Sequence, residues 1–247
     1  MAPPMEIGNS TFLRKKGTKL TILANIIQIF LILATSLLSL QSSTSSVVPS
    51  FTEKSHSATK TFIAFTALFN ALHATVYFYY EKSDVDSQRP GPRNRGLVQF
   101  VTTKLKHIVR AAVLLFISTL IFHCIAILFG APLIVGVSET YHFSLMLTAT
   151  TVFPACLTLG TNAEEWLKVF IHKKPGNILE KQLLITFWCS IIGAWLGAFP
   201  IPLDWDRPWQ EWPISCVLGT LFGYVTGLLG SSFYLAWLQR RQKTKSF

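Results

Sequence analysis

Six long apolar segments constrain the fold of this chain more than any other feature of its sequence. Each reaches or approaches the roughly 20 residues that an α-helix needs to cross a lipid bilayer. A chain in lipid must hydrogen-bond its own backbone, which favours helices over open strands. Half of the sequence is hydrophobic and only 14% is charged, whereas charged residues make up about a quarter of a soluble domain. The sequence therefore predicts an all-α polytopic membrane protein with about six transmembrane helices, at Leu20–Leu40, Thr61–Tyr80, Ile108–Phe129, Tyr141–Gly160, Gln182–Leu203 and Pro213–Leu238.

Lysine and arginine are unevenly distributed around these segments. The N-terminus, the loop around 81–110, the 161–181 loop and the C-terminal tail together hold 19 of the 22 lysines and arginines. Because basic residues concentrate on the cytoplasmic side of a membrane protein, we expect both termini to be cytoplasmic. The same placement at the membrane edges argues against nucleic acid as a partner. The expected organisation is a cytoplasmic segment at 1–19, a single transmembrane domain at 20–238 and a cytoplasmic basic tail at 239–247.

The C-terminal tail carries a candidate localisation signal. Lys243 and Lys245 stand at the fifth and third positions from the C-terminus in "KTKSF". This spacing resembles the dibasic retrieval signal of resident endoplasmic-reticulum membrane proteins, which is read from the cytosol. The alternative is a solvated basic tail that anchors the last helix.

Glycines recur at every fourth position in the last two apolar segments. They are Gly193 and Gly197 in one segment and Gly219, Gly223 and Gly227 in the other. Glycines at this spacing form a flat stripe on one helix face, along which a second backbone can approach closely. The stripe predicts helix packing within this protein. The alternative is that part of it docks a helix of another subunit.

The stretch "IPLDWDRPWQEWP" separates those two segments, and its prolines prevent a continuous helix. Tryptophan rings favour the headgroup level of a membrane, and aspartate is excluded from its hydrocarbon core. The stretch is therefore predicted to form a turn on the luminal side. It is either a rigid aromatic hairpin or a surface that binds a partner or a lipid headgroup, for which the candidates are Asp204, Trp205, Asp206, Arg207, Trp209 and Trp212.

Several polar side chains fall within the predicted helices. Asn25 and Gln28, and also Asn70 and His73, are spaced three apart and so share a helix face. His123 lies deep in the third segment. Ionisable groups at membrane depth are functional candidates, although a histidine bonded across a helix interface is the commoner arrangement. Pro154 is expected to kink the fourth helix.

The sequence offers no catalytic constellation. The loops on the predicted luminal side hold few acidic residues, and their spacing matches no two-metal hydrolase site. The four cysteines lie in apolar segments without the spacing of a zinc site. We therefore predict no catalytic residue, no metal site and no cofactor.

Three stretches carry a resemblance to a known family. "FHCIAILFGAPL" (Phe122–Leu133), "GAWLGAFPIPLDWDRPWQEWPISCVLG" (Gly193–Gly219) and "FGYVTGL" (Phe222–Leu228) resemble the PIG-F family, the phosphatidylinositol-glycan biosynthesis class F proteins. The resemblance is close from about Val109 to Leu238. It implies a small multispanning protein of the endoplasmic reticulum that takes part in assembly of the glycosylphosphatidylinositol (GPI) anchor.

The resemblance also implies a role. The family associates with and stabilises the ethanolamine-phosphate transferases PIG-O and PIG-G, whose own domains carry the catalytic site. We therefore expect a non-catalytic accessory subunit that acts in the lumen, with the GPI-precursor glycolipid as a further candidate partner. Two alternatives stay open. Asp204, Asp206 and Arg207 could contribute directly to the transferase active site, or the chain could present or move lipid along a polar groove near His73 and His123.

Overall fold

A computed structural model describes residues 18–34, 60, 63–64, 66–68, 70–71, 97–203 and 210–244. Within these residues the chain is mostly helical and contains no strand. The first helix is Thr18–Ala34. The later elements are α3 (Leu97–Leu128), α4 (Val137–Thr150), α5 (Val152–Leu159), α6 (Ala163–Trp166), the π-helical turn η2 (Leu167–Ile171), α7 (Ile178–Ala198) and α8 (Ile214–Thr244).

Four stretches of the described chain are long and apolar enough to cross a membrane. They are Ile108–Leu128, Val137–Leu159, Ile178–Ala198 and Ile214–Arg241. These stretches agree with the last four predicted segments to within a few residues. The first predicted segment coincides with the shorter apolar helix Thr18–Ala34, and its remainder from 35 to 40 lies outside the described residues. Only isolated helical positions between 60 and 71 are described from the second predicted segment.

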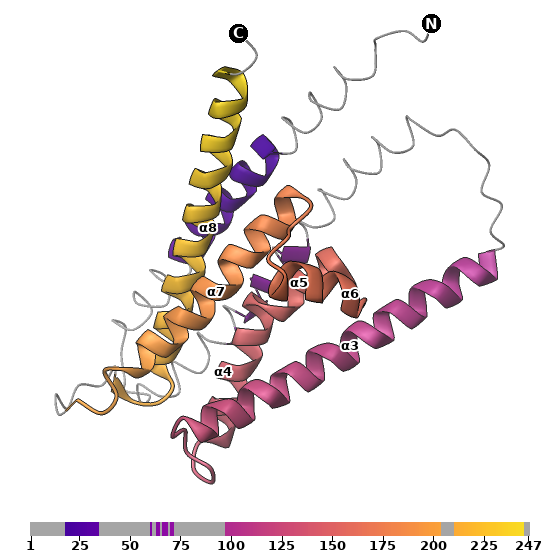
Figure 1. Cartoon of the computed structure of the whole chain (residues 1–247). Helices are drawn as coiled ribbons and strands as arrows, with labels where there is room; N and C mark the ends of the chain where they lie inside the picture. The colour runs from indigo at the N-terminus through magenta and orange to yellow at the C-terminus, as the bar shows by residue number, and fades with distance from the viewer. Residues whose placement is uncertain are drawn as a thin grey trace, which may run out of the picture.

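Two antiparallel helices, α7 and α8, form the most extensive helix–helix contact in the described chain (Figure 1). The core beside them is built from apolar side chains of α4 and α8, including Phe143, Met146, Leu221 and Leu228. Ile32 of the first helix joins the same core. The C-terminal pair therefore holds the N-terminal helix and α4 in one bundle.

The long helix α3 runs diagonally past this bundle and packs mainly along α4 (Figure 1). Its large apolar side chains, such as Ile108, Phe116 and Ile121, are exposed. The helix is fixed to α4 in part by a hydrogen bond between the hydroxyls of Thr119 and Thr148, whose oxygens lie 3.0 Å apart. In a bilayer, the exposed face of α3 is suited to contact with lipid tails.

The predicted kink of the fourth span is present as a break between α4 and α5. The break falls at Thr151, where the backbone has φ −116° and ψ −67°. Pro154 follows three residues later, and a proline can neither donate to the carbonyl of the residue four positions before it nor fit beside that carbonyl in a regular helix. The Thr150 and Thr151 hydroxyls donate to backbone carbonyls of the preceding turn. The two short helices still continue along one span, Val137–Leu159.

The connection between α5 and α7 is a small, internally bonded unit. The side-chain oxygens of Asn162 and Asn177 cap α6 and α7 by accepting backbone N–H bonds from Glu164 and Glu180. The exposed Lys168 ammonium donates to the Glu165 carboxylate at 3.0 Å. This hydrogen bond and the charge of Glu165 raise the pKa of Lys168 above its ordinary value.

Candidate functional site

The five glycines predicted to form a helix-packing stripe meet at the contact between α7 and α8. A Cβ atom added at Gly193 would lie 2.8 Å from the Gly223 Cα, and one added at Gly219 would lie 2.8 Å from the Gly197 Cα. These distances are shorter than real Cβ contacts, so no larger residue fits without moving a backbone. The structure thus brings backbone against backbone, the arrangement that small residues allow in membranes.

The remaining glycines of the stripe continue the same contact. A Cβ at Gly227 would lie 2.8 Å from the Thr186 Cα, and one at Gly197 would lie 2.9 Å from the Cys216 Cα. The space over all five glycines is therefore occupied by this chain's own backbone. Gly230, one turn further along α8, lies outside the contact, because a Cβ added there would meet no described atom within 4 Å.

A buried polar network ties the N-terminal helix to this pair. The Asn25 Nδ2 donates to the Ser232 Oγ of α8 at 2.9 Å, and its Oδ1 accepts from the Gln182 Nε2 of α7 at 2.8 Å. Asn25 is fully buried and Gln182 is 8% exposed. One side chain of the first helix thus bridges both C-terminal helices.

A second network lies one turn further along the first helix and is centred on Tyr224 of α8. The Tyr224 hydroxyl accepts from the Gln28 Nε2 at 2.7 Å and donates to the Asn70 Oδ1 at 3.0 Å. Tyr224 is 2% exposed. The Asn25–Gln28 pair predicted to share a face therefore does so, since Asn25 bonds to α7 and α8 and Gln28 bonds to α8. Asn70 belongs to this network, whereas its predicted companion His73 lies outside the described residues.

The end of the turn between α7 and α8 is anchored to α4. The Trp212 indole Nε1 donates to the Thr140 Oγ1 at 2.9 Å, and its ring packs edge-on against Phe143 with centroids 5.3 Å apart. The Gln210 Nε2 donates to the carbonyl oxygens of Pro200 at 2.8 Å and Leu203 at 2.7 Å. These bonds fix the two ends of the turn between α7 and α8.

The middle of that stretch is not described. The candidate partner- or lipid-binding residues Asp204, Trp205, Asp206, Arg207 and Trp209 lie outside the described residues. Trp212 is the member of the predicted set that is placed, and it faces α4. At the other end of α8 the helix continues through Lys243 to Thr244, and the second residue of the predicted retrieval signal, Lys245, lies outside the described part.

Other candidates from the sequence are dispersed. His123 lies in α3 with its Nδ1 buried and without a hydrogen-bond partner among the described residues. The four cysteines, Cys124, Cys156, Cys189 and Cys216, are free thiols. Across residues 18–34, the described positions between 60 and 71, 97–203 and 210–244, no three His, Cys, Asp or Glu residues are grouped so that they could hold a metal ion.

Sequence reasoning missed three partners in these networks: Gln182, Tyr224 and Ser232. Each is a polar residue within an apolar segment, and a polar residue at membrane depth is the sequence signal that could have identified it. Thr140 was also missed as the partner of Trp212. A threonine hydroxyl in a helix can return its hydrogen bond to its own backbone, so its sequence position gives no indication of a distant partner.

Apolar spans, a close glycine contact and buried amide networks define an α-helical membrane protein with several candidate spans. Within that class, the profile of the GPI biosynthesis protein family Pig-F matches residues 32–232. The chain belongs to this family.

The similar curated proteins are consistent with this membership. The chain is 38% identical over 200 residues to a Mus musculus protein named "GPI ethanolamine phosphate transferase, stabilizing subunit", covering 80% of this chain and 87% of the mouse protein. It is 45% identical over 141 residues to a Homo sapiens protein of the same name, covering 57% of this chain and 64% of the human protein.

A Schizosaccharomyces pombe protein named "PIGF/3-ketodihydrosphingosine reductase fusion protein" is 44% identical over 119 residues, covering 48% of this chain and 24% of the fusion. No solved structure matches the chain.

Proposed function

We propose that this chain is a non-catalytic stabilising subunit of a GPI ethanolamine-phosphate transferase in the endoplasmic-reticulum membrane. The observation that carries the proposal is the similarity to the mouse stabilising subunit, which extends over 80% of this chain. The catalytic site would lie on the partner. The proposed partners are catalytic subunits of the PIG-O and PIG-G kind, which add ethanolamine phosphate to mannoses of the GPI precursor.

The shape of the bundle suits a stabilising role. The glycine contact holds the backbones of α7 and α8 close together, because the Cβ position over each glycine is filled by the opposite backbone. The amides of Asn25 and Gln28 then fix the first helix on that pair. Such a rigid unit can hold membrane helices of a larger protein without rearranging itself.

The proposed topology has six spans with both termini in the cytosol. The start of the first helix and the end of α8 lie at the same end of the bundle (Figure 1). Lys19, Arg240 and Arg241 belong to these two helix ends, and Lys181 lies in the first turn of α7. A basic end of this kind is the cytoplasmic end under the positive-inside rule. The luminal turn would then present Asp204, Trp205, Asp206, Arg207 and Trp209 to a partner or a lipid headgroup, and Lys243 and Lys245 would serve as the cytosolic retrieval signal.

This topology predicts the outcome of glycosylation tagging. Acceptor sequences inserted beside Trp209 are expected to be N-glycosylated, because glycosylation takes place in the lumen. Acceptor sequences added at either end of the chain are expected to stay unmodified. The reverse pattern would contradict the proposed orientation.

Co-purification tests the proposed function itself. The tagged chain, isolated in a mild detergent, is expected to carry a GPI ethanolamine-phosphate transferase catalytic subunit with it. Ethanolamine-phosphate transfer to a mannosylated GPI precursor should be found in this complex and not in the chain purified alone. Transfer by the chain alone would overturn the proposal, as would a complex from which the transferase is absent.

A further inference from the structure

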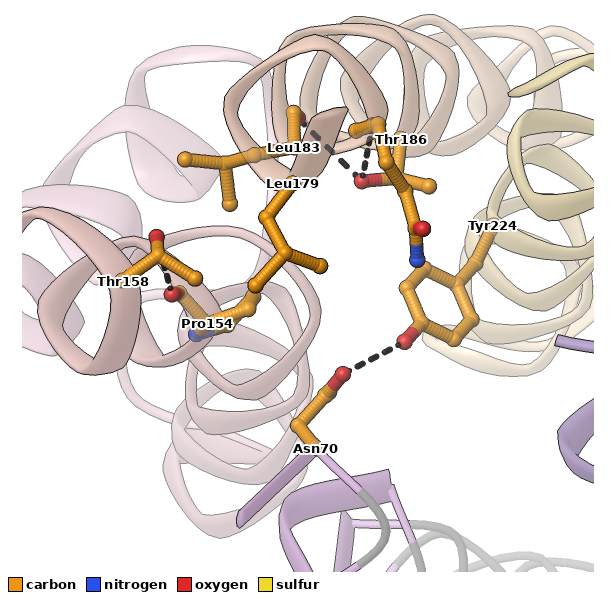
Figure 2. Close-up of a pocket in the computed structure, with 8 residues that line it drawn as sticks. Asn70, Pro154, Thr158, Leu179, Leu183, Thr186 and Tyr224 are labelled. Atoms are coloured by element: carbon orange, nitrogen blue, oxygen red, sulfur yellow. Dashed lines mark hydrogen bonds between the residues drawn. The ribbon is translucent and has the colours of Figure 1, made fainter. Parts of the chain in front are cut away.

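A small polar cavity lies between the two buried networks. It has a volume of about 30 Å³ and is lined by side chains of α5, α7 and α8 and by Asn70 (Figure 2). Figure 2 shows Pro154 and Thr158 on one side, Thr186 and Tyr224 on the other, and Asn70 facing the Tyr224 hydroxyl. Among the described residues, no carboxylate, basic or imidazole group lines the cavity, since its polar lining comes from two amides, two threonines and the tyrosine.

Two of the lining side chains have polar atoms that are buried without a partner among the described residues. These atoms are the Asn70 Nδ2, which is a donor, and the Gln182 Oε1, which is an acceptor. Each side chain is 8% exposed and is held in place by its other amide atom, Asn70 through Tyr224 and Gln182 through Asn25. The side chains that carry this donor and this acceptor therefore belong to different networks, and both line one cavity.

The threonine hydroxyls add acceptors to the same space. Thr158 donates its proton to the Pro154 carbonyl at 2.9 Å, and Thr186 donates to the Gln182 carbonyl at 3.0 Å. Their oxygen lone pairs remain able to accept a hydrogen bond. The cavity thus offers both donors and acceptors to a neutral hydrogen-bonding ligand, and its described lining holds no charge that would favour an ion.

Size restricts the ligand further. One water molecule needs roughly 10–15 Å³ of cavity volume and two to four polar partners. The cavity therefore has room for about two water molecules. Leaving a buried polar group unpaired costs about 1–3 kcal/mol, and a bound water can satisfy the amides that the protein does not pair. We propose that this cavity is a neutral hydroxyl-binding site occupied by one or two water molecules, which join the Asn70–Tyr224 network to the Gln182–Asn25 network inside the membrane bundle.

The consequence is a water-mediated link between the N-terminal and C-terminal helices. Direct hydrogen bonds already hold Asn25 and Gln28 against α7 and α8. The bound water would extend this connection to α5 through Thr158. It would also give the unpaired amide atoms of Asn70 and Gln182 a hydrogen-bond partner. This inference concerns the fold and does not depend on the proposed function.

Hydroxyl-radical labelling by X-ray radiolysis of the full chain tests the proposal. The protein is placed in nanodiscs of phosphatidylcholine, a lipid without a headgroup hydroxyl, so that water is the only hydroxyl ligand available. Radicals generated from a water inside the cavity are expected to oxidise Tyr224, although only 2% of that residue is exposed. Met146 is the internal control, because it is 1% exposed, does not line the cavity and carries an easily oxidised sulfur. Tyr224 should be labelled severalfold faster than Met146.

Matched variants and a second lipid complete the experiment. Gln182→Leu, which removes the free acceptor together with the hydrogen bond to Asn25 and adds no easily oxidised group, is expected to slow Tyr224 labelling severalfold while Met146 labelling is unchanged. Tyr224 labelled no faster than Met146 in the wild-type chain would overturn the proposal, and this comparison requires no variant to fold. Labelling that persists when phosphatidylinositol is added supports water as the ligand, whereas labelling that disappears would assign the site to a lipid hydroxyl in membranes that contain this lipid.

Discussion

Replacing Gly219 with alanine is expected to destabilise the protein strongly. The added Cβ would lie 2.8 Å from the Gly197 Cα, and the atoms it meets are backbone, which cannot rotate away. Helices α7 and α8 would have to separate along their whole contact. Overpacking of this kind costs about 2–3 kcal/mol, which exceeds the gain of about 1 kcal/mol that alanine brings over glycine within a helix. The measurement is the midpoint of thermal unfolding of the purified chain in a mild detergent.

Gly230→Ala is the matched control in the same helix. A Cβ at this position would meet no described atom within 4 Å, so only the higher helix propensity of alanine affects the stability. Its unfolding midpoint should equal or slightly exceed that of the wild type. Equal midpoints for Gly219→Ala and Gly230→Ala would show that the α7–α8 contact is not the close approach described above.

Tyr224→Phe is expected to produce the second large loss of stability. The ring and its packing stay, but the hydroxyl that joins Gln28 to Asn70 is removed. Two buried amides would then lose a partner in an apolar bundle. Interhelical hydrogen bonds in membranes contribute roughly 0.6 kcal/mol on average and up to about 1.7 kcal/mol, so we expect about 1–3 kcal/mol for the two together. The unfolding midpoint should fall measurably, in the same detergent.

Tyr234→Phe provides the comparison for that variant. Tyr234 lies on the same helix, is 37% exposed and interacts through its ring with Lys181 and Trp237. Phenylalanine preserves those ring contacts, so the midpoint should change little. If the two phenylalanine variants unfold at the same temperature, the Gln28–Tyr224–Asn70 network does not stabilise the bundle.

The helices that cross a membrane could be predicted closely from the sequence, because lipid imposes a length and an apolar composition on each of them. Four predicted segments coincide with four apolar helices of the structure. Glycine spacing likewise identified the residues of a close contact, since the absence of a side chain at every fourth position is visible in one helix alone. The break at Thr151 followed from the chemistry of a single residue, Pro154.

The pairing of polar groups could not be predicted in this way. Asn25 and Ser232 are 207 positions apart, and Asn25 and Gln182 are 157 positions apart. A single sequence shows that each is polar at membrane depth but not which faces will meet. The same limit applied to the glycine stripe, for which an internal and an external partner were both compatible with the spacing. Three-dimensional packing decides which backbone occupies the space over Gly193 and Gly219.

The turn between α7 and α8 could also be predicted only in part. Tryptophan enrichment pointed to the turn, and Trp212 does take part in a defined contact with Thr140 and Phe143. That contact also depends on where α4 lies, and the sequence of the turn gives no information on the position of α4. The part played by Asp204, Asp206 and Arg207 stays a prediction.

We propose that this chain acts by keeping a transferase intact and that the catalytic site lies on the partner. The direct measurement is made in membranes with and without the chain, and it determines both the amount of the catalytic subunit and the rate of ethanolamine-phosphate transfer per catalytic subunit. We predict that removing the chain lowers the amount severalfold and leaves the rate per remaining molecule unchanged. An unchanged amount of the catalytic subunit, together with a loss of ethanolamine-phosphate transfer per catalytic subunit, would contradict this account.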